Sequence, residues 1–172
     1  MYNIGAYVSY RAEGICVVSE IRSQKFGMLN EHKDFYILSP LRDSNSKLFV
    51  PTDSEELVSK MRPLCSADDV NALAESSLQK RFDWELQARR RSNFFKNILA
   101  DGDRAALIQL IHTICEREKE LSQIGKHVTQ SDMTALERAK RMLVNEFSFT
   151  TDIIDEQKLM AVINCQDKCM DK

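Results

Sequence analysis

The spacing of hydrophobic residues along the chain changes near residue 63. Before this point, short runs rich in β-branched and aromatic residues alternate with turn-forming residues, a pattern that predicts β-strands. A short helix or helical turn is expected over residues 53–61, and Pro63 interrupts the pattern. Four or five short strands at this spacing predict a small, strongly bent sheet or an open barrel. The predicted strands cover residues 5–10, 14–22, 34–39 and 46–51.

After residue 66, hydrophobic residues recur every three or four positions, which predicts amphipathic helices. Ser66 followed by Asp69 is typical of a helix start, and Gly102 is suited to end a helix. The predicted helices cover residues 66–79, 84–100 and 103–123, a fourth that starts at Thr129 or Ser131, and a weaker one over 152–163.

This change of pattern predicts an α+β protein with two domains. Residues 1–65 are expected to form the small β domain, and residues 66–172 the all-helical bundle. With 172 residues, of which 43% are hydrophobic, the chain has enough apolar side chains for two small cores. Residues 164–172 are polar, and we expect them to form a flexible tail.

The net charge of −2 argues against a protein that holds nucleic acid by overall charge. The charge is uneven, however: residues 80–96 contain six Lys or Arg against two Asp or Glu, hence a local charge of +4. Any phosphate contact is expected there. No apolar run reaches the roughly 20 residues that span a bilayer, and the N-terminus lacks the pattern of a signal peptide. We therefore expect a cytoplasmic protein with no membrane partner.

Residues that carry catalytic or metal chemistry are scattered. The five cysteines are odd in number and spread along the chain, which argues against a disulfide framework. Cys165 and Cys169 lack neighbouring ligands, so no metal site is expected. His112 and Cys115 could meet on one helix, but Cys115 lies on its apolar face, which favours core packing. Without a nucleophile motif or a phosphate-binding glycine loop, the sequence predicts no enzyme, no cofactor and no small-molecule substrate.

Trp84 is the only tryptophan, and its position allows two interpretations. On one continuous helix over residues 84–99, Trp84 shares a face with Ala88, Phe95 and Ile98 and belongs to the core. If the helix begins just after it, Trp84 lies at the exposed start of the helix beside a basic surface. There an aromatic ring can stack on a base or wedge between bases.

The same helix carries the predicted DNA contacts. Arg89, Asn93 and Lys96 share the face opposite to the apolar one, with Arg90 at its edge, and Arg91 completes the basic run. These side chains could contact phosphates, which positions a protein on DNA without reading its sequence, or could simply be solvated. The candidate DNA-binding residues are therefore Trp84, Arg89, Arg90, Arg91, Asn93 and Lys96.

The β domain offers a separate candidate site for a protein partner. An exposed strand edge lets a partner add a strand through backbone hydrogen bonds. The apolar segment Lys47, Leu48, Phe49 and Val50 could be that edge, or it could be an ordinary buried strand.

Several segments, in this order and at this spacing, resemble the CarD/CdnL family of bacterial transcription regulators. The resemblance covers about residues 3–150, and no single segment is specific for the family. The segments are 4–10 (IGAYVSY) with Gly14, 35–38 (FYIL) followed by 49–51 (FVP), 62–64 (RPL), Arg90 and Arg91 leading to 98–103 (ILADGD), and 136–146 (LERAKRMLVNE).

The resemblance implies a two-part transcription regulator. Its N-terminal domain would be Tudor-like, similar to the RNA-polymerase-interacting domain of the transcription-repair coupling factor, and would bind the β subunit of RNA polymerase. Its helical domain would contact promoter DNA at the upstream edge of the transcription bubble, where a tryptophan wedges into the minor groove and slows bubble collapse. The alternative is a protein–protein adaptor with the same two domains and no DNA contact.

Overall fold

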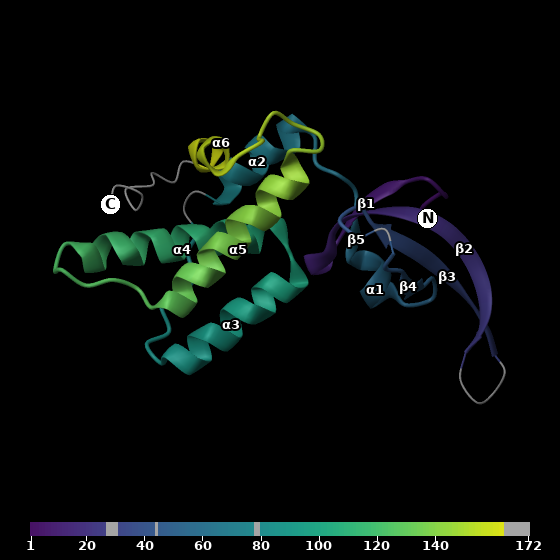
Figure 1. Ribbon diagram of the computed structural model, residues 1–172, viewed down its shortest axis with the longest axis horizontal. Coiled ribbons are helices and arrows are strands. Elements are labelled where there is room, and N and C mark those ends of the chain that lie inside the picture. The colour runs from purple at the N-terminus through teal and green to yellow at the C-terminus, as the bar shows by residue number, and fades with distance from the viewer. Residues whose placement is uncertain (27–30, 44, 78–79, 164–172) are drawn as a thin grey trace. The chain divides into compact units, whose positions relative to one another are not determined.

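The computed structural model describes residues 1–26, 31–43, 45–77 and 80–163. The chain forms two compact units, Met1–Leu64 and Cys65–Lys172. The first unit is a sheet with one short α-helix and the second is helical (Figure 1), which confirms the predicted α+β class. The predicted tail, residues 164–172, lies outside the described residues.

In its described residues, the N-terminal unit is a five-stranded antiparallel sheet with the strand order β4-β3-β2-β1-β5. A 3-10 turn at Arg11–Glu13 joins the first two strands, and α1 (Glu55–Ser59) precedes the last. The two longest strands, β2 and β3, form a curved ribbon (Figure 1). The strands are β1 (Tyr7–Tyr10), β2 (Gly14–Phe26), β3 (Glu31–Pro40), β4 (Leu48–Pro51) and β5 (Met61–Arg62).

The sheet differs from its predicted form in two places. β2 and β3 continue beyond the predicted limits at residues 22 and 34, because their outer residues pair across the ribbon although most of them are polar. A pattern of hydrophobic residues cannot reveal such a segment. The predicted helix over 53–61 is also too long: its last residue, Met61, instead belongs to β5, which pairs with β1.

One face of the sheet carries the core of this unit. Alternate residues of each strand point to that face, as the two-residue repeat of a strand requires. Leu57 and Val58 of α1 pack against it, so the short helix covers this apolar face. The buried residues of the core are Val8, Tyr10, Cys16, Val18, Tyr36, Leu38, Val50 and Met61.

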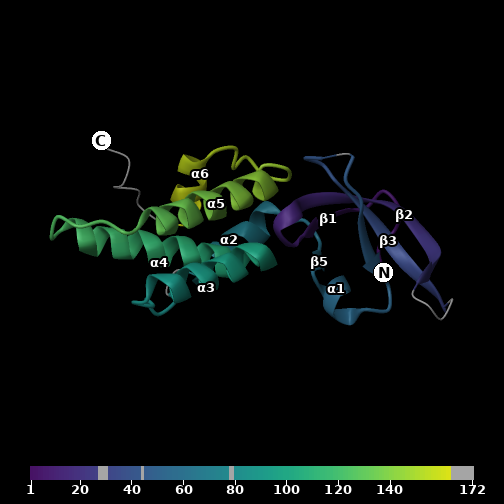
Figure 2. The ribbon, with the colours of Figure 1, turned by 60° about the horizontal axis from the view of Figure 1, so that its bottom comes forward.

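The C-terminal unit consists, in its described part, of five α-helices. α4 and α5 lie side by side in both views, with α3 and α6 against α5 (Figures 1 and 2). The helices are α2 (Ala67–Ser77), α3 (Ala88–Asp101), α4 (Arg104–Ser122), α5 (Gln130–Phe147) and α6 (Glu156–Val162).

Short polar side chains start α2, α4 and α5, as predicted. Ser66 and Asp69 bond reciprocally at the start of α2, where the Ser66 N–H donates to the carboxylate at 2.8 Å. Asp103 caps α4. Of the two candidate caps for α5, the structure uses Thr129, which forms a capping box with Asp132.

The helix that carries the basic run begins after residue 84, the first residue of the continuous helix considered in the sequence analysis. α3 starts at Ala88, so Trp84 precedes it, in agreement with the second interpretation of the tryptophan. Phe95 and Ile98 are buried on the inner face of α3, whereas Ala88 is exposed. Ala88 has the helical spacing of this face, seven residues before Phe95, but it is exposed because it is the first residue of the helix.

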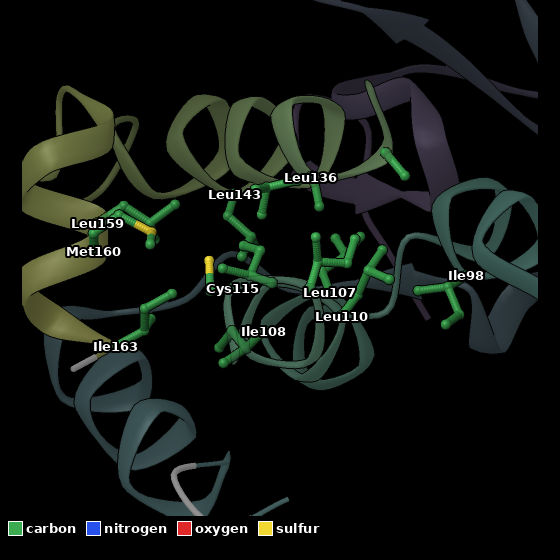
Figure 3. Close-up of a cluster of buried hydrophobic side chains, with 14 of the residues drawn as sticks. Ile98, Leu107, Ile108, Leu110, Cys115, Leu136, Leu143, Leu159, Met160 and Ile163 are labelled. Atoms are coloured by element: carbon green, nitrogen blue, oxygen red, sulfur yellow. The ribbon is translucent and has the colours of Figure 1, made fainter. Parts of the chain in front are cut away.

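The core of the helical unit fills the space between α4, α5 and α6 (Figure 3). Leu107, Ile108 and Leu143 are among its fully buried side chains. His112 and Cys115 are buried as well, and the His112 Nε2 lies 2.8 Å from the Ile163 carbonyl oxygen, which ties α4 to the end of α6. Their predicted place in the core is confirmed. None of the described helices is long and apolar enough to cross a membrane.

Candidate functional site

Strand β4 forms one edge of the sheet, since β3 is its only neighbour in the strand order. The Thr52 N–H donates to the Asp34 carbonyl at 2.9 Å, which shows which residues of β4 form hydrogen bonds to β3. Bonded pairs alternate in an antiparallel ladder, so Val50 and Leu48 bond to β3 and the N–H and C=O of Phe49 point away from it. Pro51 shares this outward phase but has no N–H. Within β4, Phe49 therefore supplies the outward N–H.

The side chains of this segment divide between the two faces of the sheet. Val50 is buried in the core, with Leu48 packed against it. Phe49 is 49% exposed, and its ring packs edge-on against Phe35 at 6.3 Å between centroids. Lys47 donates from Nζ to the Ser39 hydroxyl at 2.7 Å. Residues 47–50 were interpreted either as an exposed edge or as a buried strand. Both interpretations fit in part, because β4 is an edge strand in which Phe49 is exposed and Val50 is buried.

On α3, the predicted outer face is a surface of positive charge. Arg89, Arg90, Asn93 and Lys96 are all exposed. No ion pair joins Arg89, Arg90 or Lys96 to a carboxylate in the part of the chain that the structure describes. By contrast Arg81, nearby in sequence, pairs with Glu116 at 3.2 Å. These four side chains, called the α3 basic face below, are open to an anionic partner.

Arg91 does not belong to the α3 basic face, so its predicted role as a DNA contact is wrong. It lies one helical turn before the buried Phe95 and is itself only 4% exposed. Its guanidinium binds the Asp132 carboxylate with two bonds, Nε to Oδ1 at 2.9 Å and Nη2 to Oδ2 at 2.8 Å. A buried, bidentate pair of this kind leaves no charge for phosphate.

Trp84 is held by packing although it precedes the helix. The Arg91 guanidinium carbon lies 4.4 Å from the centroid of the indole ring, and that of Arg117 lies 5.7 Å from it. The ring also meets Phe95 edge-on, at 6.2 Å between centroids. Trp84 is half-buried and packs against the helical core, so it combines features of both interpretations.

Comparison with known proteins supports the N-terminal half of the resemblance. Residues 2–64 match the family model described as the CarD-like/TRCF RID domain. The N-terminal unit is a CarD-like RNA-polymerase-interacting domain. The match coincides with the unit Met1–Leu64 and does not include the helical unit, whose resemblance stays a prediction. No curated protein matches the chain.

The family match covers the N-terminal unit and assigns no role to a particular strand or to the helical unit. Among the described residues, no group of three His, Cys, Asp or Glu could hold a metal ion. Cys165 and Cys169 lie outside them. What the two units present is therefore a strand edge in the RID domain and a charged face on α3.

Asp132 organises the start of α3 and was missed at the level of sequence. Its Oδ2 also accepts from the Thr129 N–H at 3.1 Å and the Thr129 hydroxyl at 2.7 Å. Arg91 donates in addition from Nη1 to the Glu85 carbonyl at 2.7 Å. The spacing of Thr129 and Asp132 was a visible signal for a cap, but nothing in the sequence linked Asp132 to an arginine 41 residues away.

Burial raises the pKa of Asp132, but hydrogen bonds from Arg91 and Thr129 and the charge of Arg91 outweigh it. The pKa of Asp132 is therefore lower than its usual value of 3.8. A depressed carboxyl pKa means that the charged form stabilises the folded state.

We predict that Arg91→Met destabilises the protein by about 3–5 kcal/mol, because it leaves the Asp132 carboxylate buried without its partner. Arg90→Met, at the exposed neighbour, should cost less than about 0.5 kcal/mol. The double variant Arg91→Met/Asp132→Leu should recover much of the stability, since it leaves no buried charge. Urea unfolding measures all three, and equal effects of Arg90→Met and Arg91→Met would contradict the buried pair.

The free energy of unfolding should depend on pH through Asp132. Its contribution is present above the unfolded-state pKa and is lost as the pH falls through the lower folded-state pKa, from about pH 4 downward. We expect Asp132→Asn to be less stable at neutral pH and to lose less stability than the wild type on acidification. Urea unfolding between about pH 7 and pH 3 measures this difference. Parallel curves for the two proteins would show that Asp132 does not carry the effect.

Proposed function

We propose that the protein is a transcription regulator that binds the β subunit of RNA polymerase through its RID domain and contacts promoter DNA through α3. The DNA contact would lie near the upstream edge of the transcription bubble. The protein would work in the cytoplasm, where bacterial RNA polymerase acts. The observation that carries the proposal is the RID domain with an open strand edge at β4.

The chemistry of β4 supports a protein partner at that edge. A partner strand could accept the outward Phe49 N–H and donate to its C=O, as in strand addition to other exposed sheet edges. The half-exposed Phe49 ring, supported by Phe35, would give the contact an apolar anchor beside these backbone bonds. Lys47 lies at the beginning of the same segment and could add a charged contact.

The α3 basic face supports a DNA contact. Its three cations have no ion-pair partner among the described residues, so binding phosphate would break no existing pair. Released counterions would then favour binding. Asn93, on the same face, can donate to a phosphate oxygen without adding charge. Such contacts would be weak and mostly directed to the DNA backbone, because few cations take part.

The proposed action is a shift of population and involves no catalysis. A protein that is tethered to polymerase and contacts DNA better in the open than in the closed complex stabilises the open complex by that difference in binding free energy. We propose no enzymatic activity, cofactor or small-molecule substrate for this chain. Whether transcription rises or falls depends on which step of promoter opening is slow.

The alternative is an adaptor that binds polymerase and a second protein without touching DNA. The acidic overall composition favours this alternative, since the net charge is −2. The two proposals differ in their dependence on salt. Phosphate contacts weaken with salt by about 0.9 log unit per contact for each tenfold rise in concentration, whereas an adaptor has no DNA affinity to lose.

We predict that Phe49→Pro weakens binding of the full-length protein to the polymerase β subunit more than Phe49→Ala does. Both variants lack the ring, but only proline also removes the outward N–H, and it spares the β3–β4 bonds because the Phe49 N–H does not belong to them. We expect the additional weakening from proline to be about tenfold, the value of roughly one good hydrogen bond. Calorimetry with the isolated β subunit measures it. Equal affinities for both variants and the wild type would exclude β4 as the docking edge.

Neutralising the α3 basic face should reduce both the DNA affinity and its dependence on salt. For Arg89→Gln/Arg90→Gln we expect the slope of log affinity against log salt to fall by about 0.9 for each phosphate that the variant no longer binds. A matched control is Arg138→Gln/Arg141→Gln, which removes two exposed arginines from α5. Fluorescence anisotropy with a forked promoter DNA reports the slopes. Equal reductions in the two pairs would place the DNA elsewhere, and no binding by the wild type would favour the adaptor.

A further inference from the structure

The segment that leads into α3 exposes one large apolar side chain. Leu86 is 80% exposed, more than any other large hydrophobic residue in the described part of the helical unit; the next are Ile154 at 66% and Ile124 at 65%. A single exposed leucine is common and has no meaning by itself. Its backbone and its neighbours distinguish this one.

The backbone that carries Leu86 is fixed by the buried ion pair. Arg91, held by Asp132, donates from Nη1 to the carbonyl of Glu85 at 2.7 Å and to that of Leu86 at 3.5 Å. The Glu85 carboxylate in turn accepts from the Gln87 N–H at 2.8 Å. Leu86 is therefore presented on an ordered segment, so little conformational freedom would be lost when it enters a partner.

Positive charge follows directly along the chain. Arg89 and Arg90 lie three and four residues after Leu86, in the first turn of α3, and both are exposed. The start of the helix adds its own positive end. An apolar tip beside two cations matches the chemistry of a DNA minor groove, where a leucine can enter a base step while arginines hold the adjacent phosphates.

Trp84 is less suited to that task. Its ring already packs against Phe95 and below the Arg91 guanidinium, 4.4 Å from the ring centroid, and it would have to leave both neighbours to enter DNA. Leu86, which is 80% exposed, has much less packing to lose. We propose that Leu86, supported by Trp84 and Arg91, is the apolar residue that inserts between base pairs of promoter DNA. This inference rests on the proposed DNA contact of α3 and names the residue that enters the duplex.

The test compares Leu86→Ala with Trp84→Phe in the full-length protein. The DNA is a forked promoter fragment with 2-aminopurine at the upstream junction, whose fluorescence rises when the base is unstacked. The second measurement is the lifetime of the open complex that RNA polymerase holoenzyme forms on the same promoter. Ile124→Ala serves as the control, because it truncates another exposed aliphatic side chain, just after the end of α4.

We expect Leu86→Ala to abolish the fluorescence rise and to shorten the open-complex lifetime by about tenfold, the value of a side chain buried on insertion. Its melting temperature and the salt slope of its DNA affinity should equal those of the wild type, since the substitution alters neither the core packing nor the phosphate-binding side chains. Trp84→Phe should keep the lifetime within about twofold if its ring only supports the segment.

Two outcomes would overturn the inference and are distinguishable. If the wild type prolongs the open complex and Leu86→Ala matches it while Trp84→Phe does not, the tryptophan enters the DNA and the proposed function stands. If the wild type neither binds the forked DNA nor changes the open-complex lifetime, the proposed DNA contact fails and the role of Leu86 fails with it.

Discussion

The buried pair of Arg91 and Asp132 is the interaction on which the arrangement of the helical unit's charged surface depends. It joins α3 to the first turn of α5, and through Arg91 it also holds the Glu85 carbonyl and the Trp84 ring. Two buried charges are costly to desolvate, and this cost is offset only because nearly all polar atoms of the pair find partners. The pair therefore contributes more to the placement of neighbouring groups than to overall stability.

The helices and strands could be predicted from the sequence where hydrophobic spacing or helix-capping residues marked them. Helical spacing located α4 and α5, and the caps at Asp103 and Thr129 fixed their starts. The outer parts of β2 and β3 were missed, because a ribbon held by backbone bonds needs no hydrophobic pattern. The start of α3 was misplaced because the apolar residues before it have helical spacing, while the segment they lie on is irregular and Gln87, just before the helix, has an extended backbone.

The candidate sites were predictable to a smaller extent. Helical spacing separates Arg89 and Lys96 from the apolar face, and both are exposed in the structure. The same spacing also places Arg91 on the inner face, but a run of three arginines suggests one shared role when only charge is considered. Its partner, Asp132, is distant in sequence, and the exposure of Leu86 depends on where the helix begins. Contacts between segments distant in sequence determine whether such residues are buried or exposed. These contacts cannot be predicted from the local pattern of a single sequence.

The phase of β4 has a consequence for how long a partner can stay. The strand ends at Pro51, whose carbonyl already accepts from the Ser54 N–H at 3.3 Å, so within β4 the open backbone groups are concentrated at one residue, Phe49. A partner strand would gain very few backbone bonds from such a short edge. A complex held mainly by such an edge would dissociate quickly. For the transcription regulator proposed above, brief residence would let the polymerase leave the promoter once elongation begins.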